Sequence, residues 1–123
     1  MLEIKKITTA LGSIIESNED IESLVGWNSE EILEKTGISQ RYISTEGETS
    51  ETLALKAVQE ISDEDLRQCD LILSVTNTPE NDFPTIAHFI HSEMNLSKHI
   101  KCLGLNAGCT GFTDALELVY SYF

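Results

Sequence analysis

The segment Ile100-Lys-Cys-Leu-Gly-Leu-Asn-Ala-Gly-Cys-Thr-Gly-Phe112 joins two different hydrophobic patterns. Ile100 to Leu105 is a short apolar run typical of a strand, and residues 112–122 carry apolar side chains at helical spacing. Cys109 therefore lies at a strand-to-helix junction. Backbone N–H groups at a helix N-terminus lack internal partners and, with the helix macrodipole, favour a negative charge such as a thiolate. This position makes Cys109 a candidate nucleophile, and a buried structural thiol is the alternative.

Two further strand-and-helix patterns precede this segment. Residues 71–76 form an aliphatic run without alternation, which is typical of a strand covered on both faces in a parallel sheet. Apolar side chains at helical spacing predict helices over residues 50–61 and 84–95. With a first strand predicted at residues 2–15, the βαβαβα order indicates an α/β fold of mostly parallel strands flanked by helices.

The first part of the chain is predicted to hold two short helices. Ser17 or Asn18 can cap one of them, and a second begins with a serine cap at Ser29 and ends at Gly37. Residues 38–49 are polar and irregular, so we expect a loop there. A second loop is expected at residues 77–84, at the carboxyl end of a strand, where α/β sheets bind ligands.

Composition excludes several classes of partner. The formal net charge of −13 disfavours nucleic acid and anionic membrane surfaces, both of which need Lys and Arg. The sequence lacks a run of 18 apolar residues, so we expect a cytoplasmic protein. Three cysteines without CxxC spacing argue against a disulfide framework, and the single pair His88 and His91 is too little for a zinc site. No metal site is expected.

Five segments resemble the β-ketoacyl-acyl carrier protein synthase III branch of the thiolase-fold condensing enzymes. The matches occur in the family's order and cover nearly the whole chain: Glu34 to Ile43 with its Thr-Gly-Ile core, Thr49 to Ala57, Asp70 to Thr76, Asp82-Phe-Pro84 and Asn106 to Phe112. The resemblance implies a thiolase-like N-terminal half with a layered sheet. It also implies a second, pseudo-symmetric half after these residues in the family, so residues 1–123 are expected to be one half-domain truncated before it.

The resemblance also implies a reaction. The family cysteine matching Cys109 accepts an acyl group as a thioester, from acyl-coenzyme A or an acyl-acyl carrier protein, and then reacts with malonyl-acyl carrier protein. The residue matching Phe83 reaches across a twofold homodimer toward the partner's acyl pocket, and the residue matching Asn77 lies near that pocket. No permanently bound cofactor is implied. The family's catalytic histidine and asparagine match none of these 123 residues, so the chain alone is expected to lack condensing activity.

Other interpretations of the same residues remain open. Glu31 stands where many family members carry a tryptophan that packs on adenine, and Gly108 stands where alanine is common. An acid offers no stacking face, which leaves room for another donor, or for an amine or hydroxyl acceptor. A non-catalytic thiolase-fold module for binding or dimerisation is the competing hypothesis. Locally, Phe83 could plug its loop onto the core, and Arg41 could form a salt bridge instead of binding a ligand.

Overall fold

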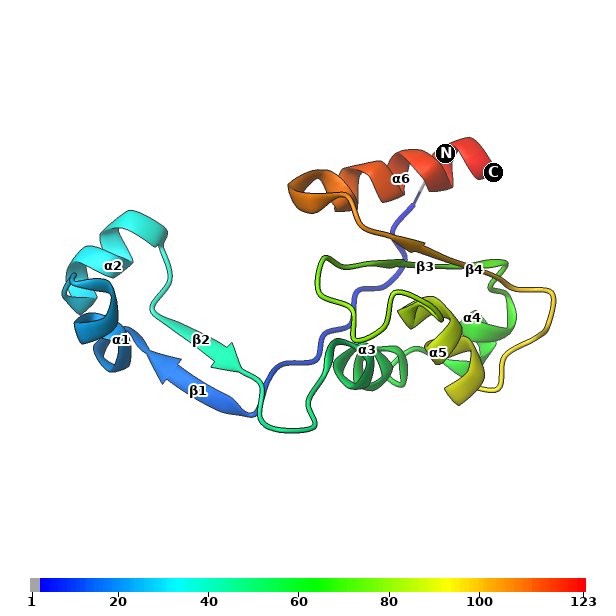
Figure 1. Ribbon diagram of the computed structural model, residues 1–123. Helices are drawn as coiled ribbons and strands as arrows, with labels where there is room; N and C mark the ends of the chain where they lie inside the picture. The colour runs from blue at the N-terminus through cyan, green and yellow to red at the C-terminus, as the bar shows by residue number, and fades with distance from the viewer. Residues whose placement is uncertain (1–2) are drawn as a thin grey trace. The chain divides into compact units, whose positions relative to one another are not determined.

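The computed structural model describes residues 3–123, which form two compact units (Figure 1). One unit comprises Leu11–Glu48, and the other comprises the chain up to Ala10 together with Thr49–Phe123. The strand predicted at residues 2–15 begins with Leu2, which lies outside the described residues. None of the helices within residues 3–123 is both long enough and apolar enough to cross a membrane.

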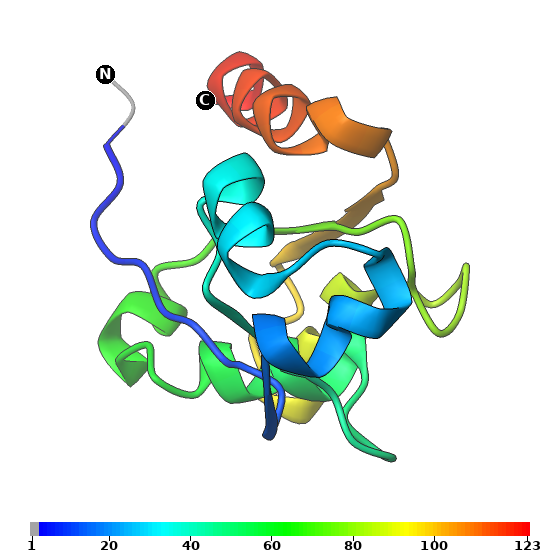
Figure 2. The ribbon, with the colours of Figure 1, turned by 90° about the vertical axis from the view of Figure 1, so that its left-hand side faces the viewer.

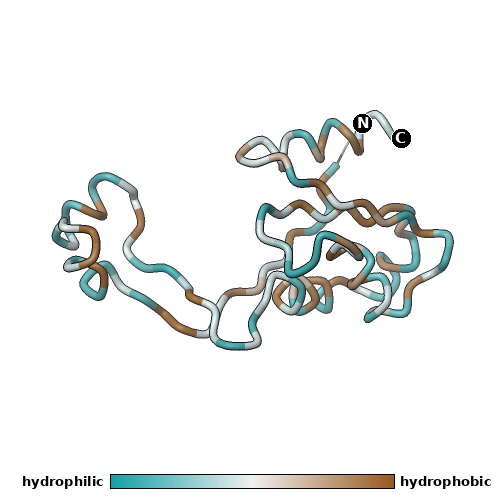
Figure 3. Tube along the Cα trace, viewed as in Figure 1, coloured by the Kyte–Doolittle hydropathy of each residue, from teal (hydrophilic) through white to brown (hydrophobic). Residues whose placement is uncertain are grey.

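The larger unit is built on a pair of parallel strands. Its elements follow in chain order: α3 (Ser50–Val58), α4 (Asp63–Arg67), β3 (Leu71–Val75), α5 (Ile86–Glu93), β4 (Lys101–Leu105), the 3₁₀ turn η1 (Gly108–Thr110) and α6 (Gly111–Tyr122). β3 pairs with β4 from Leu71 opposite Lys101 to Val75 opposite Leu105. Apolar residues run along both strands (Figure 3). The strands and helices predicted from residue 50 onward are confirmed, with ends shifted by a few residues.

Helices cover both faces of this strand pair. Successive side chains of a strand point to opposite faces. Gly104 of β4 lies against Thr85, just before α5, whereas Val75 of β3 lies against Gly111, at the start of α6. Figures 1 and 2 show α6 on one side of the two strands and α3 and α5 on the other. Coverage on both faces explains why the aliphatic runs lack alternation.

The core of the larger unit centres on the inner face of α5. The predicted apolar stripe is buried there, with Ile86, Ala87 and Ile90 all below one tenth exposed. α5 contacts β3, β4 and α3. Burial of an aliphatic side chain contributes about 1.5–3 kcal/mol, so this face contributes much of the stability of the unit.

The smaller unit pairs two strands in the antiparallel sense. It contains β1 (Ile14–Ser17), α1 (Asn18–Val25), α2 (Ser29–Thr36) and β2 (Gln40–Ile43). Ile14 lies opposite Ile43, and Ser17 lies opposite Gln40. Both helices end at glycines with left-handed backbone, Gly26 and Gly37, as predicted for Gly37. Asn28, and not Ser29, caps α2, because the Asn28 side chain accepts a hydrogen bond from the N–H of Glu31.

Two predictions for the first 49 residues are wrong. The strand expected over residues 2–15 is confined to β1, and residues 3–13 are irregular although Ile4, Ile7 and Leu11 follow a strand-like pattern. The loop expected over residues 38–49 contains β2. β2 pairs with β1 in the antiparallel sense, so the parallel pairing of the predicted α/β fold is found in the larger unit, between β3 and β4. The cause is the same in each case: a strand needs a partner, and side-chain alternation does not reveal which segment supplies one.

Candidate active site

Cys109 lies in η1, between the end of β4 and the start of α6. The strand-to-helix junction predicted from the sequence is therefore present. Gly108 takes φ +57, a left-handed value that favours glycine, and it lets the chain turn sharply after the strand. Gly111 allows α6 to begin against β3, because a Cβ there would stand 2.7 Å from Val75 Cγ1. The Cys109 residue itself is exposed.

Asn77 supports the turn that carries Cys109. This residue follows β3, and its Oδ1 accepts a hydrogen bond from the N–H of Gly108 at 3.1 Å. The bond joins the loops at the carboxyl ends of the two parallel strands. It also satisfies one of the N–H groups that the start of a helical segment leaves without an internal partner. Asn77 thus contacts the residue next to the candidate nucleophile.

Hydroxyl groups fix the same turn from the helix side. Thr110 Oγ1 lies 3.0 Å from the carbonyl oxygen of Ala107 and 2.8 Å from Asp114 Oδ2. Thr113 Oγ1 donates to the carbonyl of Thr110 at 2.7 Å. These bonds hold the backbone around Cys109 in one conformation, which is what a site for nucleophilic attack requires.

Phe83 occupies the loop between β3 and α5 and is 76% exposed. The idea that it plugs this loop onto the core is therefore wrong. Its ring packs edge-on against His88, with the ring centroids 5.2 Å apart. The peptide bond from Phe83 to Pro84 is cis. The structure thus joins Asn77 to the turn of Cys109, whereas the ring of Phe83 contacts His88 of α5.

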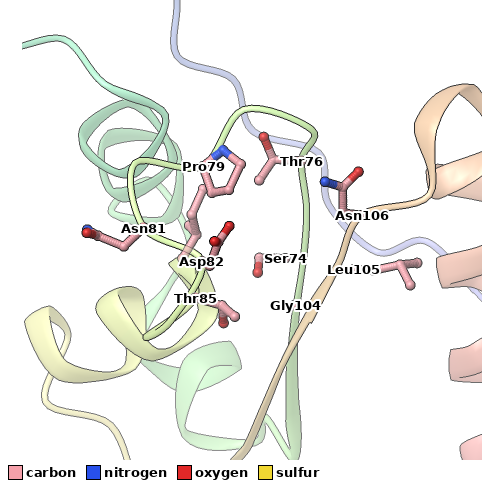
Figure 4. Close-up of a pocket in the computed structure, with 10 residues that line it drawn as sticks. Ser74, Thr76, Pro79, Asn81, Asp82, Thr85, Gly104, Leu105 and Asn106 are labelled. Carbon is pink, nitrogen blue, oxygen red and sulfur yellow. The ribbon is translucent and has the colours of Figure 1, made fainter.

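A cavity of about 120 Å³ opens at the carboxyl ends of β3 and β4, on the face that carries Thr85 (Figure 4). Most of the residues that line it are polar by type, and they come mainly from the strand ends and the loop after β3: Ser74, Thr76, Pro79, Asn81, Asp82, Thr85, Ile86, Gly104, Leu105 and Asn106. This is the strand edge where the sequence predicted ligand binding. The individual lining residues were not predicted, although polar residues at alternate positions, Ser74 and Thr76, gave a signal.

The loop after β3 is anchored to the first turn of α3. Ser50 Oγ donates to the carbonyl of Thr78 at 2.9 Å, and Glu51 Oε1 accepts from the N–H of Glu80 at 3.2 Å. Glu51 is only 7% exposed, and its Oε2 has no partner among the described residues. Sequence reasoning missed this anchor, because a glutamate in the first turn of a helix is ordinarily a solvated residue.

The other two cysteines differ from Cys109. Burial raises the pKa of the Cys69 thiol, and Cys69 Sγ donates to the carbonyl of Leu71 at 3.2 Å. Burial also raises the pKa of the Cys102 thiol, with a smaller contribution from Cys69. A raised pKa lowers the fraction of reactive thiolate at neutral pH. These surroundings suit a packing role for both residues.

The histidines take part in local contacts. His88 Nδ1 is hydrogen-bonded to Thr85 Oγ1, and His91 Nε2 lies 2.9 Å from the carbonyl oxygen of Ser97. Within residues 3–123, no group of three or more His, Cys, Asp or Glu side chains is arranged to hold a metal ion.

Three charged side chains of the smaller unit, those of Arg41, Glu31 and Lys35, contact neighbouring residues. Arg41 forms the predicted type of salt bridge, with Nη1 3.4 Å from Glu16 Oε2, and it also donates to Asn18 Oδ1 at 2.9 Å. Glu31 accepts a hydrogen bond from the N–H of Asn28 at 2.9 Å, so it completes the cap of α2. Lys35 Nζ lies 4.9 Å from the centroid of the Trp27 ring.

Comparison with known proteins supplies the family. No family model matches the chain. It is 36% identical over 118 residues to β-ketoacyl-[acyl-carrier-protein] synthase III 2 of Bacillus anthracis, covering 94% of this chain and 36% of that protein. It is 35% identical over 122 residues to β-ketoacyl-[acyl-carrier-protein] synthase III of Rhizobium meliloti, covering 97% and 38%. The chain thus spans little more than a third of the length of these relatives.

Solved structures of the same family superimpose on the chain. The synthase III of Thermus thermophilus superimposes with a TM-score of 0.85 at 28% identity, over 98% of this chain and 38% of that one. The synthase III of Aquifex aeolicus superimposes with a TM-score of 0.80 at 30% identity, over 94% of this chain and 39% of that one. The parallel strands and the cysteine turn therefore define the class as the thiolase-fold condensing enzymes. The chain belongs to the β-ketoacyl-acyl carrier protein synthase III family, and it corresponds to an N-terminal part of that family's proteins.

Proposed function

We propose that Cys109 is the acyl-accepting nucleophile of a β-ketoacyl-acyl carrier protein synthase III-type acyltransferase. The observation that supports this role most directly is the exposed thiol in a turn fixed by hydrogen bonds, at the carboxyl ends of two parallel strands. Ligands of open α/β sheets bind at this edge. Residues 1–123 then supply the N-terminal half-domain of the enzyme.

The first half-reaction is an acyl transfer between two thiols. Cys109 Sγ, as the thiolate, attacks the carbonyl carbon of an acyl thioester and forms a tetrahedral oxyanion. The C–S bond to the donor then breaks, the acyl group stays on Cys109, and the donor thiolate leaves and takes up a proton. The N–H of Cys109 serves as one donor to the oxyanion. Acyl-coenzyme A or an acyl-acyl carrier protein is the donor, and no permanently bound cofactor takes part.

The second half-reaction forms a carbon–carbon bond. Malonyl-acyl carrier protein loses carbon dioxide, the resulting carbanion attacks the thioester carbon, and Cys109 leaves as the thiolate. The product is a β-ketoacyl-acyl carrier protein of fatty acid or polyketide-type biosynthesis. In the family this step uses a histidine and an asparagine that match no residue among the 123. We therefore expect the 123-residue chain alone to be acylated without completing the condensation.

Phe83 and Asn77 are proposed as acyl-pocket residues. For Phe83 the support is an exposed aromatic ring on the loop beside the strand ends, available to a partner subunit in a homodimer. For Asn77 it is the hydrogen bond to the residue before Cys109. The net charge of −13 disfavours an acidic protein partner on this chain. A docking site for acyl carrier protein is thus expected to depend on basic groups from elsewhere in the assembly.

One experiment tests the nucleophile. The chain is incubated with acetyl-coenzyme A and with octanoyl-coenzyme A, and adducts are read by intact-protein mass spectrometry. We expect a single acyl adduct in the parent and in the matched control Cys69→Ala, and none in Cys109→Ala. An adduct that persists in Cys109→Ala would contradict the assignment. Formation of a β-ketoacyl product after addition of malonyl-acyl carrier protein would contradict the expected lack of condensation.

The competing function, a non-catalytic binding or dimerisation module, is favoured by one feature of α6. Phe112 and Tyr120 of α6, and Phe123 directly after it, are each at least 66% exposed, which is unusual for large apolar side chains in one segment. If the parent chain forms no acyl adduct and sedimentation finds concentration-dependent dimers, the binding or dimerisation function is favoured over acyl transfer.

A further inference from the structure

The exposed ring of Phe83 is supported by one neighbour on α5. Its centroid lies 5.2 Å from that of the His88 ring, and the ring planes meet at 66°. This edge-to-face geometry is a favoured arrangement for aromatic rings. The contact ties a loop side chain that is 76% exposed to the first turn of a helix whose inner face is buried.

The His88 ring is itself oriented by Thr85. Thr85 Oγ1 and His88 Nδ1 are joined by a hydrogen bond of 2.9 Å. Thr85 occupies the N-cap position of α5, yet its side chain makes no cap hydrogen bond to the backbone. The hydroxyl therefore orients the imidazole ring and does not serve the usual capping role.

Thr85 is in turn held against the sheet. A Cβ on Gly104 would stand 2.5 Å from Thr85 Cγ2 and 2.8 Å from Thr85 Cβ, so the threonine fills the space that glycine leaves on β4. A continuous series of contacts thus runs from Gly104 through Thr85 and His88 to Phe83. It begins in the strand that leads into the Cys109 turn.

We propose that His88 is a positioning residue that fixes the Phe83 ring and thereby sets which acyl chain lengths Cys109 of the partner subunit accepts in a homodimer. The inference rests on the proposed function, in which Phe83 belongs to an acyl pocket. His88 acts through Phe83 and does not contact the acyl group. Without the imidazole ring, Phe83 is free to adopt other side-chain rotamers, so the pocket that it borders loses its fixed depth.

The test measures acylation of Cys109 with acetyl- and octanoyl-coenzyme A and compares the ratio of the two rates. His88→Ala removes the ring, and Thr85→Val removes the hydroxyl while it keeps the shape against Gly104. An aromatic edge-to-face pair corresponds to about a threefold to tenfold effect, and we expect the ratio to shift by that factor in both variants. Thr85→Ser retains the hydroxyl and should keep the parent ratio.

His91→Ala is the matched control, because it removes a histidine of the same helix that is bonded to Ser97. It should leave the ratio unchanged. Chemical shifts of the Phe83 ring protons give a second readout, and they should move in His88→Ala and Thr85→Val but not in His91→Ala. An unchanged rate ratio or unchanged Phe83 shifts in an acylated His88→Ala variant overturns the role of His88 and leaves the proposed function standing. A parent chain that forms no adduct overturns both.

Discussion

Replacement of Asn77 by alanine should slow the acylation of Cys109. The change removes the acceptor of the 3.1 Å hydrogen bond from the N–H of Gly108 and leaves a backbone donor without its partner beside Cys109, the proposed nucleophile. A neutral hydrogen bond contributes about 0.5–1.5 kcal/mol, and this one is exposed, so the lower half of that range applies. A loss of about 0.5–1 kcal/mol of ordering in the turn predicts a rate lower by about twofold to fivefold.

The assay is intact-protein mass spectrometry of acyl adduct formation under excess acetyl-coenzyme A. Thr78→Ala is the matched control, since Thr78 lies in the same loop and its backbone carbonyl, not its side chain, accepts the hydrogen bond from Ser50. Asn77→Asp separates two effects: its carboxylate can still accept from Gly108, but it places a negative charge near the reacting thiolate. We expect Asn77→Asp to be slow as well and to recover at high salt, which screens the charge. Equal rates for Asn77→Ala, Thr78→Ala and the parent would refute the supporting role of Asn77.

Three further predictions concern packing, titration and thiol reactivity. Gly104→Ala should lower the free energy of unfolding by about 1–3 kcal/mol in urea titrations, because its Cβ would overlap Thr85, and adding Thr85→Ser should recover part of the loss. Hydrogen bonds from Ser17 hold the pKa of the Asp20 carboxyl below its ordinary value. The stability that this lowered pKa contributes is fully present above the unfolded-state pKa of about 3.9. It is lost as the pH falls through the lower pKa of the folded state. Asp20→Asn should remove this contribution to the pH dependence of the free energy of unfolding. If NMR finds that the Asp20 carboxyl in the folded chain titrates at its unfolded-state pKa, the prediction is contradicted. Iodoacetamide at neutral pH should modify Cys109 before Cys69 or Cys102, since burial raises the pKa of the latter two; peptide mapping that finds equal modification would contradict this order.

Sequence reasoning succeeded where one residue pattern has one structural meaning. The aliphatic runs at residues 71–75 and 101–105 indicated strands of a parallel sheet, and the glycines around Cys109 marked the strand-to-helix turn. Gly37 ended its helix as expected. The position of Cys109 followed from these local signals, and the ordered matches along the chain indicated the family that the comparisons then supplied.

Sequence reasoning failed where structure depends on a distant partner. Gln40 to Ile43 is a polar stretch that forms a strand only because Ile14 to Ser17 lies beside it. The burial of Glu51 depends on the loop after β3, and the contact of Thr85 with Gly104 depends on the packing of α5 on β4. Such contacts join residues 19 to 29 positions apart, and single-sequence periodicity carries no information at that range.

The loop after β3 is held at three places along its length: Asn77 at the Cys109 turn, residues 78 and 80 at the first turn of α3, and Phe83 at His88. An exposed loop ordinarily loses conformational entropy when a partner binds it. Here much of that entropy is already lost in the folded chain. A subunit or acyl chain that contacts Phe83 therefore meets a preorganised ring, and binding at this loop should carry a smaller entropic penalty than its exposure suggests.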